Sequence, residues 1–462
     1  TRQTRAGLGA GLISVPPTPA GDPAQAVMSP DKIAATLGSV DEAKRYCSNC
    51  GTAVGRSTEG RPGRLEGFCS ACRTPFNFFT NAPKLEAGDM VAGQYEILGP
   101  IAHGGMGWIY LGRDKAVSDR WVVLKGLLNA DDPDAVLAAV AERQFLAQIE
   151  HGSIVNIYNF VTCQSAGYIV MEYVGGQSLN GKLKERRKAN DGVPHPLPVD
   201  QAIAYILGII PAFGYLHGLG LVYNDLKPAN IMVVDDGVKL IDVGAVMRAD
   251  DQNAAIFGTR GFQAPEMAGA GPSVASDLYT IGRTLAVLIL NFVYHDGAYE
   301  YALPTAADEP LFARWESLHR FLLKSTAAHP DDRFQSAPEM TAQLTGVLRE
   351  VVALSQGTPR PAASALFGGD HLPGLLADNQ ARIDAPDWRV LPSPRVDPAD
   401  PAASFLQDLP DDDPSRRLDL IAQATGTIEP TVELFLARAR ALIEIGADAQ
   451  PALDAAGQLD LW

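Results

Sequence analysis

The stretch of sequence that decides the fold reads YNDLKPAN at residues 223–230 and is followed, from Asp242, by DVG. In this stretch the Asp225 carboxylate can orient a substrate hydroxyl and accept its proton, and Lys227 can neutralise a phosphoryl group in transit. Asn230 and Asp242 offer the hard oxygen ligands that Mg2+, or Mn2+, prefers. The layout is typical of a centre for phosphoryl transfer from a nucleotide.

The chain is long and acidic. Its 462 residues are too many for one ordinary core, so we expect about two to four domains. Hydrophobic residues make up 46% of the chain and charged residues 20%, which is a globular composition. The formal net charge is −16, from 38 basic and 54 acidic residues, which argues against a nucleic-acid partner, because such binding needs a basic face. No signal peptide is visible.

Two apolar stretches, residues 203–223 and 278–294, raise the question of a membrane span. Pro211 and His217 interrupt the first stretch, and the second is short and carries Arg283. Both patterns favour buried helices of a large lobe, so we expect no transmembrane segment.

Composition divides the chain into five parts. Residue patterns predict a mostly disordered Gly/Ala/Pro-rich arm (1–40), a small cysteine module (41–82), a large unit of strands followed by helices (90–350), a Pro/Asp/Ala-rich linker (355–415) and a helical tail (416–462). In the tail, Leu434, Leu436, Ala439, Leu442 and Ile443 mark the expected apolar face of a helix.

The cysteine module holds two CxxC pairs, Cys47 with Cys50 and Cys69 with Cys72, separated by 18 residues. Two such knuckles can direct four thiolates at one metal, and both zinc and iron fit four thiolates. The alternatives are a pair of disulfides or a redox dithiol. A metal would act as a structural staple, since so short a segment has no sufficient core of its own. A further hypothesis is that oxidation of the thiolates senses redox state.

The segment IAHGGMGWIY at residues 101–110 resembles the glycine-rich loop that covers ATP phosphates in eukaryotic-type protein kinases, with alanine at the position of the first glycine. The ATP-binding residues that this resemblance implies here are Ile101, Ala102, His103, Gly104, Gly105, Met106, Gly107, Trp108 and Ile109. Lys125 ends a strand pattern eighteen residues after Gly107, where kinases place the lysine that holds the α- and β-phosphates. Glu142, on a helix expected over residues 135–149, is its implied ion-pair partner.

Later landmarks follow in kinase order. Residues 168–176 resemble the kinase hinge, with Met171 as the gatekeeper residue. The backbone groups of Glu172 and Val174 would bind the adenine edge, so the side chains of Glu172 and Val174 are expected to matter little for binding. Thr259, in the activation segment, can form hydrogen bonds with Asp225 and Lys227 and shape the floor of the substrate-binding site. The remaining landmarks are Ala264-Pro265-Glu266, Asp277, and Arg333 as the expected buried partner of Glu266. The Asp-Leu-Lys-Pro-x-Asn pattern resembles serine/threonine rather than tyrosine kinases.

One departure concerns control. Many kinases place an arginine before the catalytic aspartate to hold a phosphate on the activation loop. Asn224 stands there and cannot do so, and Thr259 is the only serine or threonine between Asp242 and Glu266. We therefore expect activity without phosphorylation of the activation loop, with regulation from the flanking domains.

The two CxxC pairs, the 101–110 and 222–230 stretches and the helical tail together resemble the soluble actinobacterial protein kinase G family. The resemblance implies a multidomain α+β chain with a bilobal kinase fold (N-lobe 90–175, C-lobe 176–350). It implies a rubredoxin-like or zinc-ribbon module before the kinase and a tetratricopeptide-like tail after it. It also implies a cytoplasmic, ATP- and Mg2+-dependent kinase, and a forkhead-associated-domain substrate that regulates 2-oxoglutarate and glutamate metabolism.

The same resemblance implies autophosphorylation of N-terminal threonines, for which Thr1, Thr4 and Thr18 are candidates. Arg73 departs from the glycine usual after a second rubredoxin knuckle, which keeps zinc beside iron as the expected metal. The tail holds about one helical pair, whereas a repeat solenoid needs about three repeats to be stable. Either the sequence is part of a longer chain or the tail packs on the kinase, and dimerisation through further repeats stays open.

Two other classes of function compete with an active kinase. One is a pseudokinase scaffold, and the other is a metal-dependent interaction protein with an accessory kinase. The presence of Lys125, Asp225, Asn230 and Asp242 favours catalysis.

Overall fold

The structure is a computed structural model, and it forms two compact units, residues 1–360 and 361–462, which are described separately. The described residues are 6–9, 11–15, 18, 21–57, 63–80, 83–104, 107–126, 144–163, 166–235, 237–250, 258–295, 297–362, 367–368, 393–397, 400–410, 413–424 and 426–459.

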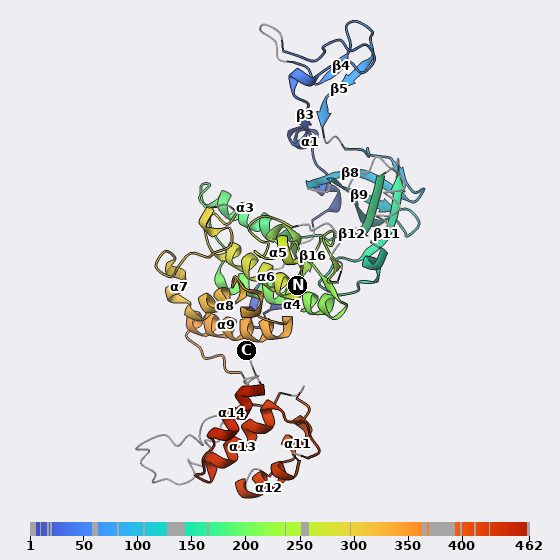
Figure 1. Cartoon of the computed structure of the whole chain (residues 1–462). Coiled ribbons are helices and arrows are strands. Elements are labelled where there is room, and N and C mark those ends of the chain that lie inside the picture. The colour runs from blue at the N-terminus through green and yellow to red at the C-terminus, as the bar shows by residue number, and fades with distance from the viewer. Residues whose placement is uncertain are drawn as a thin grey trace, which may run out of the picture. The chain divides into compact units, whose positions relative to one another are not determined.

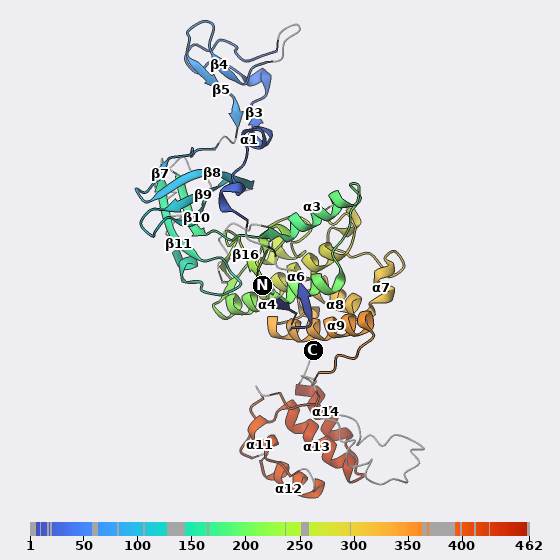
Figure 2. The same ribbon diagram turned by 180° about the vertical axis from the view of Figure 1, so that it is seen from behind.

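The N-lobe is built on an antiparallel six-stranded sheet in the order β11-β12-β10-β9-β8-β7 (Figures 1 and 2). Its strands are β7 (Met90–Val91), β8 (Tyr95–Gly104), β9 (Gly107–Asp114), β10 (Arg120–Gly126), β11 (Ile157–Cys163) and β12 (Ala166–Glu172). Side chains alternate between two faces along a strand. On β10, Val122 and Leu124 enter the lobe's own core, whereas Val123 joins the core of the helical lobe. The sheet therefore has a buried face on both sides.

The C-lobe is mainly helical. Its helices are α3 (Leu179–Ala189), α4 (Val199–Gly218), α5 (Met267–Ala270), α6 (Val274–Ile289), α7 (Pro310–Arg314), α8 (Glu316–Ser325) and α9 (Ala337–Gln356). α4 and α6 lie at its centre and contact each other, and α9 packs on α4 (Figure 1). Ser273 and Ser276 form a reciprocal capping box at the start of α6. This cap fixes where α6 begins and so where Asp277 lies.

The apolar stretch at 203–223 is part of the C-lobe core. Among the described residues, α4 is the one helix long and apolar enough to span a membrane, and 67% of its apolar window is buried within the protein. Residues 278–289 of the second stretch lie in α6, on which every residue from Ser276 to Ile289 is buried, whereas Val293 lies after the end of the helix and is 59% exposed. Both stretches thus supply the interior of the lobe.

The prediction of a disordered arm is wrong for the residues of the arm that the structure describes. β1 (Ala6–Leu8) and β2 (Ile13–Val15) form a hairpin against α4, and Ile13 is buried in the C-lobe core. The Met28 amide then donates to the Pro100 carbonyl of β8 at 2.8 Å. The few apolar residues of the arm bury themselves on the lobes rather than on one another, which composition alone does not reveal.

The second unit is helical: α11 (Ala403–Gln407), α12 (Pro414–Ala424), α13 (Val432–Glu444) and α14 (Gln450–Leu459). The prediction of a linker over residues 355–415 is corrected at both ends. α9 continues to Gln356, and α11, which lies within the expected linker, packs against α13. The expected apolar face is also corrected. Leu434 and Ala439 are buried, but Leu436 and Ile443 are 42% and 46% exposed.

Candidate active site

The catalytic loop brings three of the expected side chains into mutual contact. The Thr259 hydroxyl donates to Asp225 Oδ1 at 2.6 Å, and Lys227 Nζ donates to Asp225 Oδ2 at 2.6 Å and to Thr259 Oγ1 at 2.8 Å. Thr259 is 34 residues away from Asp225 in sequence, so the activation segment closes this triangle from outside the loop. These contacts fix the orientation of the Asp225 carboxylate, which is the group that could accept a hydroxyl proton.

The two expected magnesium ligands lie on neighbouring segments, since the Ile241 amide, next to Asp242, donates to the Asn230 backbone carbonyl at 3.0 Å. Asn230, at the end of the 3-10 turn η4 (Pro228–Asn230), is buried, and its Nδ2 donates to the Asp225 carbonyl at 2.8 Å. With its amide nitrogen engaged in this way, the carbonyl oxygen of Asn230 remains for a metal. Asp242 accepts from Lys125 Nζ at 2.5 Å and from the Gly244 amide at 2.9 Å, both through Oδ1.

The electrostatics of Asp242 suit a metal ligand. Burial alone would raise the pKa of this carboxyl, but the charge and hydrogen bond of Lys125 and the Gly244 N–H outweigh it and hold the pKa below its usual range. Asp242 is therefore a carboxylate at neutral pH, as coordination of Mg2+ requires.

Asn224 has a structural role that sequence reasoning missed. Its φ is +68°, in the left-handed region that asparagine tolerates better than most residues. The backbone N–H groups of Tyr223 and Asn224 donate to the buried Asp277 carboxylate at 2.7 and 2.8 Å, and Asn224 Nδ2 donates to the Ala245 carbonyl at 3.0 Å. The asparagine therefore ties the catalytic loop to the segment after Asp242, and Asp277 fixes that loop on α6.

The described residues of the glycine-rich segment lie at the end of β8 and the start of β9. Gly104 pairs with Gly107, and Gly107 has a φ of +118°, which a side chain would not tolerate. His103 and Trp108 meet edge to face across the hairpin, with ring centroids 4.8 Å apart. Ile101 and Ile109 pack against the C-lobe core, which places them on the side of the sheet that faces the catalytic loop. Gly105, Met106 and Glu142 lie outside the described residues.

The hinge expectation is wrong in one respect, because the Glu172 side chain has a partner. Lys239 Nζ on β16 (Gly237–Leu240) donates to both Glu172 carboxylate oxygens at 2.6 and 2.8 Å, and Asn156 Nδ2 donates to Oε2 at 2.8 Å. This pair joins the end of β12 to the C-lobe. Met171 is buried in the core, as a gatekeeper residue would be. Val174 is partly buried and packs against the same core.

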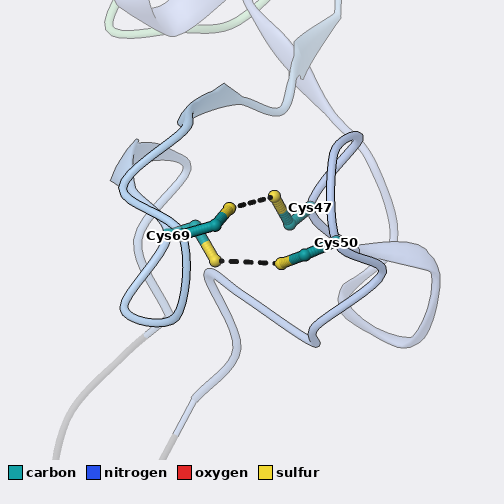
Figure 3. Close-up of side chains that lie close together, drawn as sticks. Cys47, Cys50 and Cys69 are labelled. Carbon is teal, nitrogen blue, oxygen red and sulfur yellow. Dashed lines mark hydrogen bonds between the residues drawn. The ribbon is translucent and has the colours of Figure 1, made fainter.

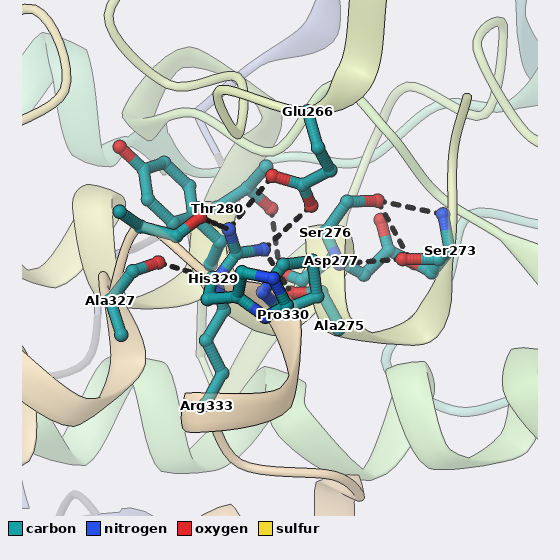
Figure 4. Close-up of polar contacts among 12 residues, drawn as sticks. Glu266, Ser273, Ala275, Ser276, Asp277, Thr280, Ala327, His329, Pro330 and Arg333 are labelled. Atoms are coloured by element: carbon teal, nitrogen blue, oxygen red, sulfur yellow. Dashed lines mark hydrogen bonds and ion pairs between the residues drawn. The ribbon is translucent and has the colours of Figure 1, made fainter. Parts of the chain in front are cut away.

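The expected pair of Glu266 and Arg333 is present (Figure 4). The guanidinium donates to both carboxylate oxygens at 2.7 and 2.8 Å and also to the carbonyls of three alanines, Ala275, Ala327 and Ala328. The Arg333 side chain is fully buried. These contacts join the end of the activation segment to α6 and to the turn before α9, so the pair is structural.

The four cysteines converge on one point, as the spacing predicts. Their sulfur atoms lie within 4.8 Å of one another, with Cys47 and Cys72 at 3.5 Å and Cys50 and Cys69 at 3.6 Å (Figure 3). A tetrahedral site with metal–sulfur bonds of about 2.3 Å needs sulfurs about 3.8 Å apart, so this donor set fits a metal. Hydrogen bonding to Thr74 lowers the pKa of Cys72 to about 6, which favours the thiolate that a metal binds.

The two knuckles have the same backbone geometry. The Gly51 amide donates to the Cys47 carbonyl at 3.0 Å, and the Arg73 amide donates to the Cys69 carbonyl at 2.9 Å. Gly51 and Arg73 both have positive φ, +69° and +62°. Arginine in this position carries a strain that glycine does not. The departure from glycine at Arg73 is thus accommodated without a change of the knuckle.

Removal of one ligand tests the metal site. We expect Cys47→Ser to lower the bound metal from about one ion per chain to near none, because three thiolates do not complete a tetrahedral structural site. Cys163→Ser is the matched control, since Cys163 lies on β11 outside the cluster, and it should keep the full metal content. Elemental analysis of the purified chains gives both the amount and the identity of the metal. Full occupancy in Cys47→Ser would contradict a four-cysteine site.

Comparisons with known proteins agree with this organisation. Residues 95–424 match the family described as the protein kinase domain, and residues 2–85 match the family described as the protein kinase G rubredoxin domain. The serine/threonine-protein kinase PknG of Mycolicibacterium smegmatis is 44% identical over 466 residues, which cover 95% of this chain and 58% of the relative. The protein of the same name from Mycobacterium leprae is 44% identical over 475 residues, or 95% of this chain and 59% of the relative.

The chain therefore spans a little under three-fifths of the length of these two relatives. A solved structure, the kinase domain of Mycobacterium tuberculosis PknI, is 24% identical, with a TM-score of 0.46, and the match covers 57% of this chain and 98% of that chain.

Proposed function

The chain belongs to the protein kinase G family of serine/threonine protein kinases, and from that premise we propose that it transfers the γ-phosphate of ATP to serine or threonine hydroxyls of proteins. The observation that carries the proposal is the contact of Asp225 with Lys227 and Thr259, with Asn230 and Asp242 beside it. A hydroxyl at Asp225 would meet its proton acceptor, and Lys227 would stabilise the charge that develops on the transferred group.

Two residues would hold the metal-nucleotide complex. Asn230 and Asp242 would coordinate Mg2+, which neutralises charge on the phosphates when it is bound. Lys125 lies against Asp242, within reach of the phosphates of a nucleotide bound at that metal. Incubation with γ-labelled ATP, Mg2+ and a general protein substrate tests the proposal. Label on serine or threonine supports it, and its absence with all protein substrates and in the chain itself contradicts it.

We further propose that activity needs no phosphate on the activation segment. The position that would hold an arginine is filled by Asn224, whose amide bonds the Ala245 carbonyl rather than facing a phosphate. Thr259, the one hydroxyl residue between Asp242 and Glu266, is engaged with Asp225 and Lys227. A phosphate on Thr259 would bring negative charge against the Asp225 carboxylate, which is unfavourable.

Phosphatase treatment gives the corresponding prediction. The chain, shown by mass spectrometry to be unphosphorylated over residues 243–265, should keep its full initial rate, because Asn224 stands in place of the arginine that would hold such a phosphate. A kinase that depends on such a phosphate loses most of its rate on dephosphorylation, so the rates before and after phosphatase treatment distinguish the two cases. A rate that falls on dephosphorylation and returns with phosphate in this segment would refute the proposal.

The remaining family expectations are also proposals for this chain. The family suggests a forkhead-associated-domain substrate, autophosphorylation near the N-terminus and a cytoplasmic location. Of the three candidate threonines, Thr18 is described, and its hydroxyl accepts a hydrogen bond from Lys182 Nζ at 3.3 Å; Thr1 and Thr4 lie outside the described residues. The four-cysteine site would hold zinc or iron and regulate from outside the kinase lobes.

A further inference from the structure

A pocket of about 420 Å³ lies beside the catalytic triangle, and neither the family resemblance nor the mechanism assigns its chemistry. Lys227 and Thr259 form part of its wall, together with Pro228 and Ala229 of η4. A protein substrate whose hydroxyl reaches Asp225 must therefore lay its neighbouring residues across or into this space. The side chains of the pocket then select those residues.

One wall of the pocket is a single face of α3. Asn180, Leu183, Lys184 and Arg187 line it, and their spacing of three and four residues places them on one stripe of the helix. α3 packs against η4, next to the catalytic loop. With a rise of about 1.5 Å per residue, Lys184 lies about 6 Å and Arg187 about 10 Å farther along the helix than Asn180.

Hydrogen bonds hold this wall in place. Arg186 Nε donates to the carbonyls of His195 and Pro196 at 3.2 and 3.1 Å, which fixes the loop after α3 against the helix. Arg187 Nε donates to the Gly192 carbonyl at 2.7 Å. That bond orients the guanidinium and leaves its two terminal nitrogens as donors for a ligand. His195 and Pro196 complete the same side of the pocket.

The pocket has both cationic and apolar lining residues. Lys184 and Arg187 are exposed, and among the described residues no aspartate or glutamate lines the pocket and no carboxylate forms an ion pair with either cation. Phe262, Leu290 and Phe292 supply an apolar surface. In a chain of net charge −16, two unneutralised cations beside the catalytic loop stand out as a recognition feature.

We propose that this pocket selects protein substrates with an acidic side chain near the phosphoacceptor, and that Lys184 and Arg187 are the residues that determine this specificity. An extended peptide advances about 3.3 Å per residue, so it covers the distance from Asn180 to Lys184 and Arg187 in about two or three residues, and the test places the acidic residue at those two separations from the acceptor. The inference rests on the proposed function, because it names the substrate class of the same site. A carboxylate there gains two cationic partners, and an Arg–carboxylate pair adds directional hydrogen bonds.

Peptide kinetics test the inference in the 462-residue chain. Each peptide carries one threonine and either glutamate or glutamine two and three positions away, on the N-terminal side in one series and the C-terminal side in the other. In one of the two series we expect kcat/KM to favour glutamate over glutamine about five- to twentyfold, the range of one or two partly exposed ion pairs. The ratio should fall toward one in Lys184→Gln/Arg187→Gln. It should fall below one in Lys184→Glu/Arg187→Glu, so that the glutamine peptide becomes the better substrate.

Lys188→Gln is the matched control. Lys188 lies on the same helix but does not line the pocket, and Lys188→Gln removes one positive charge, as each substitution of the double variant does. This variant should keep the glutamate preference of the unchanged chain. A wild-type ratio near one in both series, or a double variant that keeps the ratio, would overturn the inference. A general loss of preference in Lys188→Gln as well would show that net charge, not the pocket, is responsible.

Binding without ATP separates this inference from the proposed function. Fluorescence anisotropy of the labelled glutamate peptide should show tighter binding than that of the glutamine peptide by a similar factor. The advantage should shrink as sodium chloride rises from about 0.05 to 0.5 M, because the pairs are exposed to solvent. Selective binding without phosphate transfer would support the pocket and contradict the kinase. Transfer without any glutamate preference in rate or binding would support the kinase and contradict the pocket.

Discussion

Asp225→Asn is expected to abolish phosphate transfer while leaving the chain folded and able to bind nucleotide. Asparagine keeps the shape of the side chain, but it cannot accept a proton from the substrate hydroxyl, and it removes the negative charge that Lys227 and Thr259 now contact. Loss of a positioned proton acceptor lowers kcat by about 10²- to 10⁴-fold. The measurement is the initial rate at saturating Mg2+ and ATP, with the affinity for ATP and the melting temperature determined on the same samples.

Asp250→Asn is the control for this prediction. It removes the same charge from an exposed aspartate whose described ion-pair partner is Arg248, away from the catalytic triangle. Its rate should match that of the unchanged chain. If Asp225→Asn kept its rate, the assignment of Asp225 as proton acceptor would be wrong. If it lost its rate together with its fold, Asp225→Glu would provide the test, because a longer carboxylate keeps the charge and misplaces it.

Arg333→Met is expected to destabilise the kinase unit by about 3–5 kcal/mol, the cost of breaking a buried ion pair by removing one partner. The Glu266 side chain is 15% exposed, so without Arg333 its charge has little access to water. The carbonyls of Ala275, Ala327 and Ala328 would also lose a donor. Urea denaturation followed by tryptophan fluorescence measures the change in the free energy of unfolding.

Arg320→Met is the control variant for Arg333→Met. Arg320 lies on α8 and forms an ion pair with Glu316, but its side chain is 77% exposed. Exposed pairs contribute between about 0 and 1 kcal/mol, so this variant should unfold close to the unchanged chain. Equal stability of the two variants would contradict the structural role given to the pair of Glu266 and Arg333. Arg333→Lys should recover only part of the loss, because lysine cannot make the forked contact.

Sequence was sufficient for the parts of the site that lie in short motifs. The pattern from Asp225 to Asn230 sets a tight loop, and its side chains meet because they are at most five residues apart. The CxxC knuckles behave in the same way, since each brings two thiolates together by local turns. The pairing of Glu266 with Arg333 spans 67 residues, and it was predictable only because the order of landmarks resembles a known fold. The contact of Lys125 with Asp242 was not predicted, since Glu142, which lies outside the described residues, was the expected partner of Lys125.

Contacts between residues that belong to no sequence motif could not be predicted from the sequence. Glu172 and Lys239 lie 67 residues apart on strands of two different sheets, so nothing local marks either as a partner. Asn224 looked like the loss of an arginine, whereas its positive φ and its bond to Ala245 show a backbone role. The arm was expected to be mostly disordered because it is rich in Gly, Ala, Pro and Ser and shows little periodicity. Its order depends on Ile13 and its neighbours meeting a surface that folds elsewhere.

The central claim is that residues 223–230 and Asp242 form a working centre for phosphate transfer. The most direct test mixes the 462-residue chain with γ-labelled ATP, Mg2+ and an acidic threonine peptide, and follows the mass and label of the peptide. The account predicts a peptide heavier by one phosphate on threonine, formed by the unchanged chain and by Asp250→Asn but not by Asp225→Asn. Equal transfer by Asp225→Asn, or none by the unchanged chain on any protein or peptide, would contradict it.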